Sequence, residues 1–264
     1  MSIVFFDIDG TFLSDLTREI PNSAKKAVKM LQKQGHKAFI NTGRTYVSLP
    51  DEIKACGFDG YVCGCGTHIY YKNQKLCESK LSVEICIKTI ETMRKFGIPA
   101  VYEEEQAIYF EKSYEAEQDK VDPVKKVMEK RNIAKIIPED IRKSPILFDK
   151  VFVFLPKNEY GIKAKEYLDT YFHCIDRGKN AFEVIQKNHT KGTGVRFVCH
   201  YLQENPEESY AFGDSMNDLD MLKETKHAVA MGVCDERILP FCEFQTDQVE
   251  EDGIYKALKK YRLI

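Results

Sequence analysis

Two short runs of polar side chains follow apolar segments, and their residue types suit divalent-metal chemistry. They contain Asp7, Asp9 and Thr11 after the apolar run 3–6, and Asp214, Asn217 and Asp218 after the apolar run 210–212. Two carboxylates two residues apart at a strand end point the same way, and they repel unless a cation offsets their charge. Oxygen ligands of this kind suit Mg²⁺, and Mn²⁺ accepts the same set. A solvated turn is the alternative interpretation of the first run alone.

Two further runs carry groups that can hold a phosphate. Thr42, Gly43 and Arg44 follow an expected strand at 38–40, where a hydroxyl and a glycine N–H can bind phosphate oxygens. Lys191 opens an expected helix, and its ammonium can neutralise phosphate charge. Taken alone, each run has an ordinary alternative, a helix N-cap or a solvated lysine. Together the four runs offer a metal site and phosphate-binding groups, which is what phosphoryl transfer requires.

The elements that must position these runs alternate between strand and helix at both ends of the chain. Strands are expected at 3–6, 38–40 and 60–63, and the first intervening helix places Ala24, Ala27, Val28 and Leu31 at i, i+3, i+4 and i+7. Towards the C-terminus, the expected order is helix 194–202, strand 210–212, a short helix around 219–222, strand 228–231 and helix 253–261. This order predicts a parallel sheet, and ligands bind at the carboxyl edge of such sheets.

The middle of the chain has a different pattern. Helices are expected at 83–96, 123–131 and 160–171, and strands at 101–102, 108–110, 148–155 and 182–185. Because these strands do not alternate cleanly with helices, they indicate a separate α+β unit. We therefore expect an α/β fold with a Rossmann-like parallel-sheet core domain, residues 1–81 and 185–264, and an inserted α+β cap domain, residues 82–184.

Composition excludes several classes of protein. The chain has 264 residues, with 39 Lys+Arg against 41 Asp+Glu, and it is 43% hydrophobic. This is too apolar for a disordered chain, and there is no basic excess to bind nucleic acid. The nine cysteines are odd in number and irregularly spaced, and no apolar stretch is long enough for a membrane span. We expect a reduced, cytoplasmic protein with no nucleic-acid or membrane partner.

In combination and in order, the four runs resemble the four motifs of the haloacid dehalogenase (HAD) superfamily. The large insertion between the second and third runs resembles the cap of its Cof-type phosphatases. The resemblance covers nearly the whole chain, and the presence of both Asp7 and Asp9 fits a phosphatase rather than a dehalogenase. One place departs from the subfamily pattern, which often has Asn-Gly where this chain reads Gly64-Cys65-Gly66.

The resemblance implies a role for each run. Asp7 would be the nucleophile that forms an aspartyl-phosphate, and Asp9 would be the general acid and base. Mg²⁺ would be bound by the side chains of Asp7 and Asp214 and the backbone carbonyl of Asp9. The phosphate would be held by Thr42, Gly43, Arg44, Lys191 and Asn217, with Lys191 also counted as catalytic. Thr11 and Asp218 would contact these groups rather than the substrate. Asp218 would anchor Lys191 or metal-bound water.

Other candidate residues have ordinary alternatives. His189, just before Lys191, could touch substrate, but a loop histidine is the simpler interpretation. Cys63, Cys65 and His68 could form half of a zinc site, but no second pair follows at a suitable spacing. Glu183, at the return from the inserted segment, is expected to face the substrate.

The leading hypothesis is thus a hydrolase acting on phosphoric monoester bonds of small molecules, either sugar phosphates or phosphorylated cofactors. A phosphotransferase or phosphomutase would use the same active-site residues but would yield an isomerised product. A receiver-like switch holding a phospho-aspartate is the non-enzymatic alternative. Such a switch would need only about half this length and no inserted domain.

Overall fold

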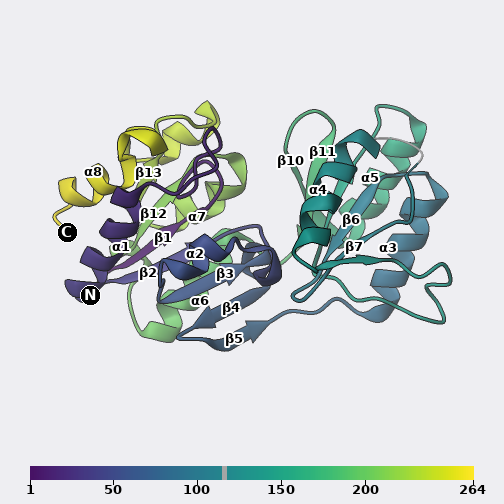
Figure 1. The fold of residues 1–264 in the computed structure, drawn as a ribbon, viewed down its shortest axis with the longest axis horizontal. Coiled ribbons are helices and arrows are strands. Elements are labelled where there is room, and N and C mark those ends of the chain that lie inside the picture. The colour runs from purple at the N-terminus through teal and green to yellow at the C-terminus, as the bar shows by residue number, and fades with distance from the viewer. Residues whose placement is uncertain (115–117) are drawn as a thin grey trace. The chain divides into compact units, whose positions relative to one another are not determined.

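The computed structural model describes residues 1–114 and 118–264, which form two compact units. The core unit contains residues 1–44, 49–78 and 189–264, and the second unit contains residues 45–48 and 79–188. Both ends of the chain, purple and yellow in Figure 1, therefore belong to the core unit. The expected inserted segment, 82–184, lies within the second unit. None of the helices in the described ranges has the length and apolar character that crossing a membrane would need.

The core unit is built on one eight-stranded sheet. Its strand order is β14-β13-β12-β1-β2-β3-β4-β5, with parallel pairing from β14 to β3 and antiparallel pairing from β3 to β5. The strands are β1 (Ile3–Phe6), β2 (Lys37–Asn41), β3 (Gly60–Cys63), β4 (His68–Tyr71), β5 (Gln74–Glu78), β12 (Tyr210–Gly213), β13 (His227–Ala230) and β14 (Phe244–Gln245). The helices are α1 (Asn22–Lys33), α2 (Asp51–Ala55), α6 (Lys191–Leu202), α7 (Leu219–Glu224) and α8 (Gly253–Lys260).

Strand β1 lies at the middle of this sheet because all of its side chains are apolar. Its four residues are buried, with β2 on one side and β12 on the other. Phe5 packs with residues of α6 and α7 in one core cluster, whereas Phe6 stacks on Phe212 at 5.1 Å between ring centroids. A strand buried on both faces reads as a continuous apolar run, as this one does.

Helix α1 turns the expected stripe towards the sheet. The four positions predicted from the sequence, Ala24, Ala27, Val28 and Leu31, are its buried residues. After the helix, Gly35 adopts φ +86°, the left-handed conformation that ends a helix with least strain in glycine. The chain then enters β2 at once. Helix α1 is therefore the crossover connection that the parallel strands β1 and β2 require.

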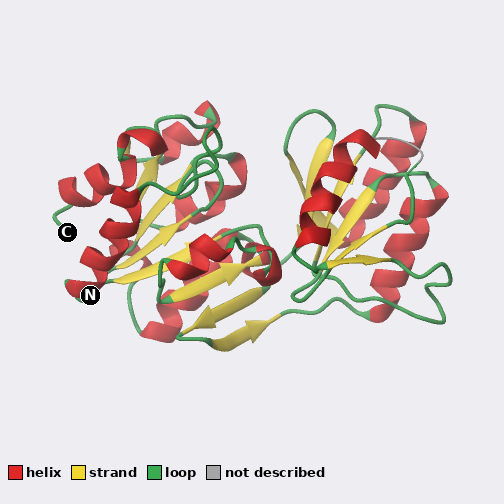
Figure 2. Cartoon of the chain, viewed as in Figure 1, coloured by secondary structure: helices red, strands yellow, loops and turns green. Residues whose placement is uncertain are grey.

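The second unit has one sheet with helices on both faces (Figures 1 and 2). Its strand order is β10-β11-β9-β6-β7-β8, antiparallel except for the β7–β8 pair. The strands are β6 (Ala100–Glu103), β7 (Ile108–Phe110), β8 (Ala134–Ile136), β9 (Lys150–Phe154), β10 (Phe172–Asp176) and β11 (Ala181–Gln186). The helices are α3 (Val83–Lys95), α4 (Gln118–Lys130) and α5 (Glu159–Tyr171).

Alternation along β6 divides the apolar residues of this unit between two clusters. Ala100 and Tyr102 pack with α3 and α5, whereas Val101 packs with Val121 of α4. Successive side chains of a strand point to opposite faces, so one strand supplies both cores. The result is a three-layer unit with α3 and α5 on one face of the sheet and α4 on the other.

Candidate active site

The nucleophile expected from the sequence lies at the carboxyl end of β1. The Asp7 N–H donates to the Phe212 carbonyl at 3.0 Å, which extends the β1–β12 ladder by one residue and fixes the Asp7 backbone. The Asp7 side chain is buried, and its Oδ1 lies 2.5 Å from Nζ of Lys191. A sheet edge thus presents a carboxylate and an ammonium in direct contact.

Lys191 joins two of the expected motifs. It is the first residue of α6 and is fully buried, and its Nζ also lies 2.5 Å from Oδ1 of Asp218. The other Asp218 oxygen, Oδ2, accepts hydrogen bonds from the N–H groups of Asp214 and Ser215, each at 3.0 Å. Asp218 is therefore fully engaged in holding Lys191 and its own loop.

Asp214 lies beside the loop that follows β1. Its Oδ1 accepts a hydrogen bond from Thr11 Oγ1 at 3.0 Å. Gly10 approaches the same carboxylate so closely that an added Cβ would lie 2.7 Å from its Cγ, and Gly10 adopts φ +79°. The glycine is required here for its backbone conformation and for space.

Burial and mutual repulsion shift the acid–base properties of this cluster. Desolvation raises the pKa of Asp7 to about 7, with the charge of Asp218 adding to the effect and Lys191 opposing it. Desolvation also raises the pKa of Asp214 to about 8, with further contributions from the charges of Asp218 and Asp7. For Lys191, burial lowers the pKa, but the carboxylates of Asp218 and Asp7 outweigh it and raise the value overall. The lysine is charged, and the carboxylates are in excess over it.

Asp7, Asp214 and Asp218 form a group with metal-binding potential. Each offers a carboxylate oxygen, and these oxygens lie within 4.8 Å of one another. Since Asp218 already accepts hydrogen bonds at both oxygens, Asp7 and Asp214 are better placed to bind a cation directly. A cation would offset the repulsion that raises their pKa values.

Asp9 points to a different partner. Arg44 donates to it at two points, Nε to Oδ2 and Nη2 to Oδ1, both at 2.7 Å. Nη2 of Arg18 lies 3.5 Å from Oδ1 of Asp9. Burial raises the pKa of Asp9, but hydrogen bonds and charge from Arg44, with the charge of Arg18, lower it overall. Arg44 was expected to hold phosphate, and in this structure it binds Asp9.

The remaining expected phosphate ligands lie in two loops of the same unit. Thr42 and Gly43 are buried, and Thr42 Oγ1 accepts from the N–H of Arg44 at 3.2 Å. Asn217 Oδ1 accepts from Ser215 Oγ at 2.8 Å, which orients the loop after β12. The amide of Asn41 donates to the Lys191 carbonyl at 2.8 Å and so ties the loop after β2 to the start of α6.

Two functional contacts could not be found from the sequence. Arg18 stands in the loop before α1, where no local pattern marks it as a neighbour of Asp9. Asn41, the last residue of β2, is buried and contacts Lys191; an amide at the end of an apolar run is the only local signal that marks it. The Asn41 contact joins segments 150 positions apart, and the Arg18 contact depends on how the loop after Asp9 folds back.

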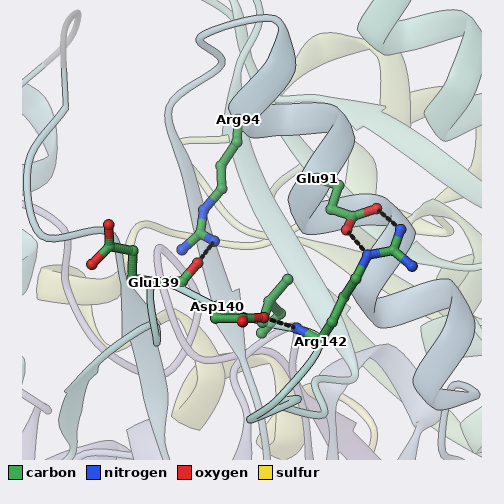
Figure 3. A pocket seen from close by; sticks show the side chains of 6 residues that line it. Glu91, Arg94, Glu139, Asp140 and Arg142 are labelled. Atoms are coloured by element: carbon green, nitrogen blue, oxygen red, sulfur yellow. Dashed lines mark hydrogen bonds and ion pairs between the residues drawn. The ribbon is translucent and has the colours of Figure 1, made fainter.

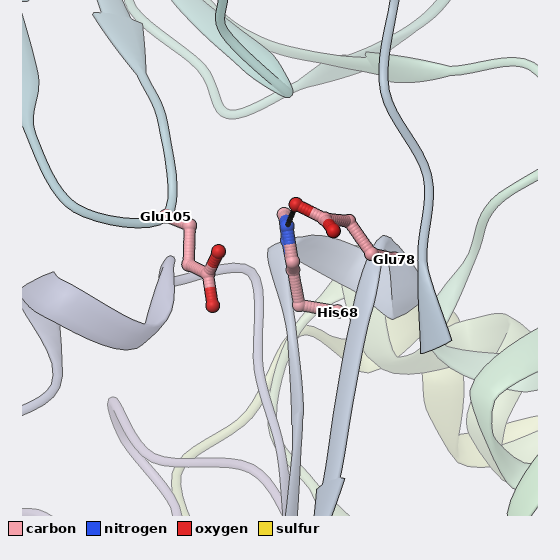
Figure 4. Close-up of side chains that lie close together, drawn as sticks. All are labelled: His68, Glu78 and Glu105. Atoms are coloured by element: carbon pink, nitrogen blue, oxygen red, sulfur yellow. Dashed lines mark ion pairs between the residues drawn. The ribbon is translucent and has the colours of Figure 1, made fainter. Parts of the chain in front are cut away.

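The weaker candidates remain ordinary. His189 donates from Nδ1 to the Gly66 carbonyl at 3.1 Å, and burial lowers its pKa. His68 is buried beside Thr67 and lies 3.7 Å from Glu78; both side chains are among those drawn in Figure 4. In the ranges that the structure describes, no group of potential metal ligands includes Cys63 or Cys65. The half-site for zinc therefore has no support.

The second unit has a surface hollow of about 440 Å³ whose two arginines, Arg94 and Arg142, are already paired (Figure 3). Arg142 binds Glu91, and Arg94 binds Glu111 together with the carbonyls of Pro138 and Glu139. Guanidinium groups satisfied in this way hold the unit together. The acids and the lysine that converge lie in the core unit, and they form the candidate active site.

The chain belongs to the haloacid dehalogenase-like hydrolases. The sequence model of that family matches residues 4–258, nearly the whole chain. This match confirms the expected family and the expected class of enzyme, a hydrolase.

Individual proteins with similar sequences match over almost their entire length. A Bacillus subtilis protein named "Putative phosphatase YkrA" is 26% identical, covering 99% of this chain and 98% of that protein. A second B. subtilis protein, 5-amino-6-(5-phospho-D-ribitylamino)uracil phosphatase YitU, is 23% identical, covering 98% of this chain and 97% of that protein. The solved structure of a HAD subclass IIB sugar phosphatase is 26% identical, covers 100% of both chains and has a TM-score of 0.83. The expected α/β architecture is confirmed by this structural similarity.

Proposed function

We propose that this protein is a Mg²⁺-dependent phosphatase that hydrolyses small-molecule phosphate monoesters through an aspartyl-phosphate on Asp7. The observation that carries the proposal is the buried Asp7 carboxylate at the end of β1, in contact with a lysine that Asp218 anchors. A nucleophilic carboxylate needs a fixed position and a nearby positive charge to approach an anionic phosphate. Asp7 has both.

The first step transfers the phosphoryl group to the enzyme. An oxygen of Asp7 forms a bond to phosphorus while the bond from phosphorus to the ester oxygen breaks. Asp9 gives its proton to the departing oxygen, so that the product leaves as an alcohol and Asp9 becomes a carboxylate. Lys191 balances the negative charge that the phosphoryl oxygens bring to Asp7.

The second step releases phosphate. A water oxygen bonds to phosphorus, Asp9 takes one proton from that water, and the bond between phosphorus and Asp7 breaks. Inorganic phosphate leaves, and both carboxyl groups return to their starting forms. Asp9 thus acts as acid in one step and base in the next, which explains why the sequence carries a second acid two residues after Asp7.

The acidic cluster fits a divalent cation. The Asp7 and Asp214 side chains would hold Mg²⁺ together with the Asp9 backbone carbonyl, because burial without a cation disfavours two adjacent carboxylates. Bound Mg²⁺ supplies positive charge against the transferring phosphoryl group. Thr11 and Gly10 keep the Asp214 carboxylate in place for this role.

The phosphate itself would be held by groups from the loops after β2 and β12. We assign this role to Thr42, the Gly43 N–H, Lys191 and Asn217. The substrate class follows from the relatives, one named for a phosphoribityl compound and one for sugar phosphates. We therefore infer small polyhydroxylated phosphates, either sugar phosphates or phosphorylated cofactor precursors, as the substrates.

The experiment is phosphate release from a panel of sugar and cofactor phosphates with Mg²⁺, run in parallel on Asp7→Asn. We expect turnover of at least one ester by the native enzyme and a loss of at least about a thousandfold in Asp7→Asn. Asp51→Asn, an exposed aspartate in the first turn of α2, is the matched control and should keep full activity. No release from any ester by folded native protein would reject the proposal.

A further inference from the structure

Arg44 makes a two-point contact with Asp9, the proposed acid–base residue. A residue that only bound phosphate would not need this contact. Its Nε and Nη2 each lie 2.7 Å from one oxygen of Asp9, so both carboxylate oxygens receive a hydrogen bond from the same guanidinium. Such a two-point contact fixes the plane and the rotation of the carboxylate as well as its position. The Asp9 side chain is about one-third exposed and Arg44 about one-quarter, so neither is held by burial alone.

A second arginine faces the same carboxylate. Arg18 lies 3.5 Å from Oδ1 of Asp9 through Nη2, and its Nη1 donates to Asp15 at 3.0 Å. Its backbone adopts φ +58°, a conformation that non-glycine residues seldom adopt, in the loop between Asp9 and α1. Arg18 also lines a hollow of about 620 Å³ in the core unit.

Stability is a poor explanation for this arrangement. Ion pairs at partly exposed positions contribute little to the free energy of unfolding. Two arginines on one carboxylate are more than the pairing of a single charge needs. Their combined effect is to hold the Asp9 carboxyl group in one orientation.

We propose that Arg44 is a positioning residue for the acid–base carboxylate of Asp9, and that Arg18 supports the same carboxylate from the neighbouring loop. This inference rests on the proposed phosphatase activity. When the ester bond breaks, the proton passes from an Asp9 oxygen to the leaving oxygen, and the two-point contact with Arg44 holds the carboxyl group in the orientation for this transfer. Arg44 thus acts on the leaving group through Asp9 and contributes little to binding the phosphate.

The test compares two esters whose leaving groups differ in their need for a proton. An alkyl phosphate such as glucose 6-phosphate must have its leaving oxygen protonated, whereas 4-nitrophenyl phosphate leaves readily as an anion. We expect Arg44→Lys, which keeps the charge but cannot form the fork, to lower kcat/KM at least about tenfold more for the alkyl than for the aryl ester. The matched control is Arg196→Lys, at an exposed arginine of α6 that is paired with Glu224. This substitution should lower kcat/KM for neither ester.

A binding measurement separates positioning from phosphate recognition. The inhibition constant of inorganic phosphate should stay within about threefold of the native value in Arg44→Lys, because the proposed phosphate ligands are unchanged. Equal losses of kcat/KM for both esters, accompanied by about tenfold weaker inhibition by phosphate, would overturn the inference and make Arg44 a phosphate ligand.

Arg18→Gln gives an independent check if Arg44→Lys does not fold. The same selective loss on the alkyl ester should appear, but it should be smaller, since Arg18 is farther from Asp9 and more exposed. Identical losses on both esters in this variant would also count against the inference. The alkyl ester is the one that the native enzyme hydrolyses best in the panel; failure of the native enzyme on every ester of the panel would instead reject the proposed function, and the inference with it.

Discussion

At the residue scale, the site is defined by a lysine that is fully buried among carboxylates. Nζ of Lys191 contacts Asp7 and Asp218, and Asp214 lies within reach of the same group of oxygens. Burying such a cluster is costly, and apolar residues of similar volume often serve stability as well or better. The cluster is therefore better explained by chemistry than by folding, as perturbed pKa values at a sheet edge also suggest.

The substitution Gly10→Ala, which adds one methyl group beside Asp214, tests whether the cluster serves chemistry. In Gly10→Ala the new Cβ would press on the Asp214 carboxylate, whereas the same change at Gly35, also at positive φ, meets nothing within 4 Å. Both variants should lose about 1–2 kcal/mol in the free energy of unfolding, because both strain the left-handed backbone. Only Gly10→Ala should also lose activity and Mg²⁺ affinity, measured by phosphate release and calorimetric titration. Full activity in Gly10→Ala would show that the Asp214 position is unimportant.

At the element scale, the start of α6 determines where Lys191 lies. Thr190 is the N-cap: its Oγ1 accepts from the Thr193 N–H at 3.3 Å, and Thr193 Oγ1 accepts from the Thr190 N–H at 3.0 Å. This reciprocal capping box fixes the first turn, in which Lys191 is the first residue. A helix opening at Lys191 was expected from the sequence, but the capping box between Thr190 and Thr193 that fixes its first turn was not.

Thr190→Ala should therefore affect activity more than stability. Loss of the cap costs about 1 kcal/mol in the free energy of unfolding. Ser82→Ala removes the cap of α3, where Ser82 Oγ accepts from the Ile85 N–H at 3.3 Å, and should cost a similar amount. Denaturant unfolding and phosphate release on both variants make the comparison. The account predicts a drop in kcat for Thr190→Ala alone, and equal activities would contradict it.

The elements were predictable where local chemistry decides them. Strand β1 and the buried stripe of α1 were both predicted, because an apolar run and a 3.6-residue period carry the information. Strand β10 was missed because it follows α5 directly at Phe172, with no turn residue between the two elements. Helix α4 begins at Gln118 rather than at Pro123, so the proline lies inside the helix near its start.

The residues of the candidate site could be predicted from the sequence, but the contacts between their side chains could not. The acids and Lys191 were identified because strand ends on one sheet must share an edge. The contact of Arg44 with Asp9 spans 35 positions in the sequence, and the contact of Asn41 with Lys191 spans 150. Such pairings depend on side-chain directions in the folded unit, which no local pattern encodes.

At the scale of the whole molecule, strand order explains why residues about 200 positions apart meet. Strand β1 lies between β2 and β12, so the loops after three parallel strands open at one edge. These loops carry Asp7, Thr42 and Asp214. Residues 79–188 are inserted between β5 and α6 without interrupting this sheet.

The stability of the whole protein should depend on pH and Mg²⁺ together. The pKa values of Asp7 and Asp214 are raised from 3.8 to about 7 and about 8. The folded state therefore binds more protons than the unfolded state between these values, and stability falls as pH rises from about 4 to about 8. Mg²⁺ replaces those protons, so its stabilising effect should grow over the same interval. Free Mg²⁺ at about 100 times its Kd would add about 2.7 kcal/mol.

Differential scanning calorimetry at pH 6 and pH 8, with and without Mg²⁺, measures this coupling. The rise in Tm caused by Mg²⁺ should be larger at pH 8 and should vanish in Asp214→Asn. Asp51→Asn, an exposed aspartate in the first turn of α2, is the control and should keep the full rise. A rise that is the same at both pH values, or that survives in Asp214→Asn, would place Mg²⁺ elsewhere.

The measurement that tests the central claim most directly is chemical trapping of the phosphorylated enzyme. The protein is mixed with a turned-over phosphate ester, quenched within the first turnover and reduced with borohydride, which converts an acyl phosphate to an alcohol. Peptide mass spectrometry then locates the change. The account predicts reduction at Asp7, only when substrate is present, and none in Asp7→Asn. Reduction at another carboxylate, or steady turnover with no trapped residue at any quench time, would contradict Asp7 as the nucleophile.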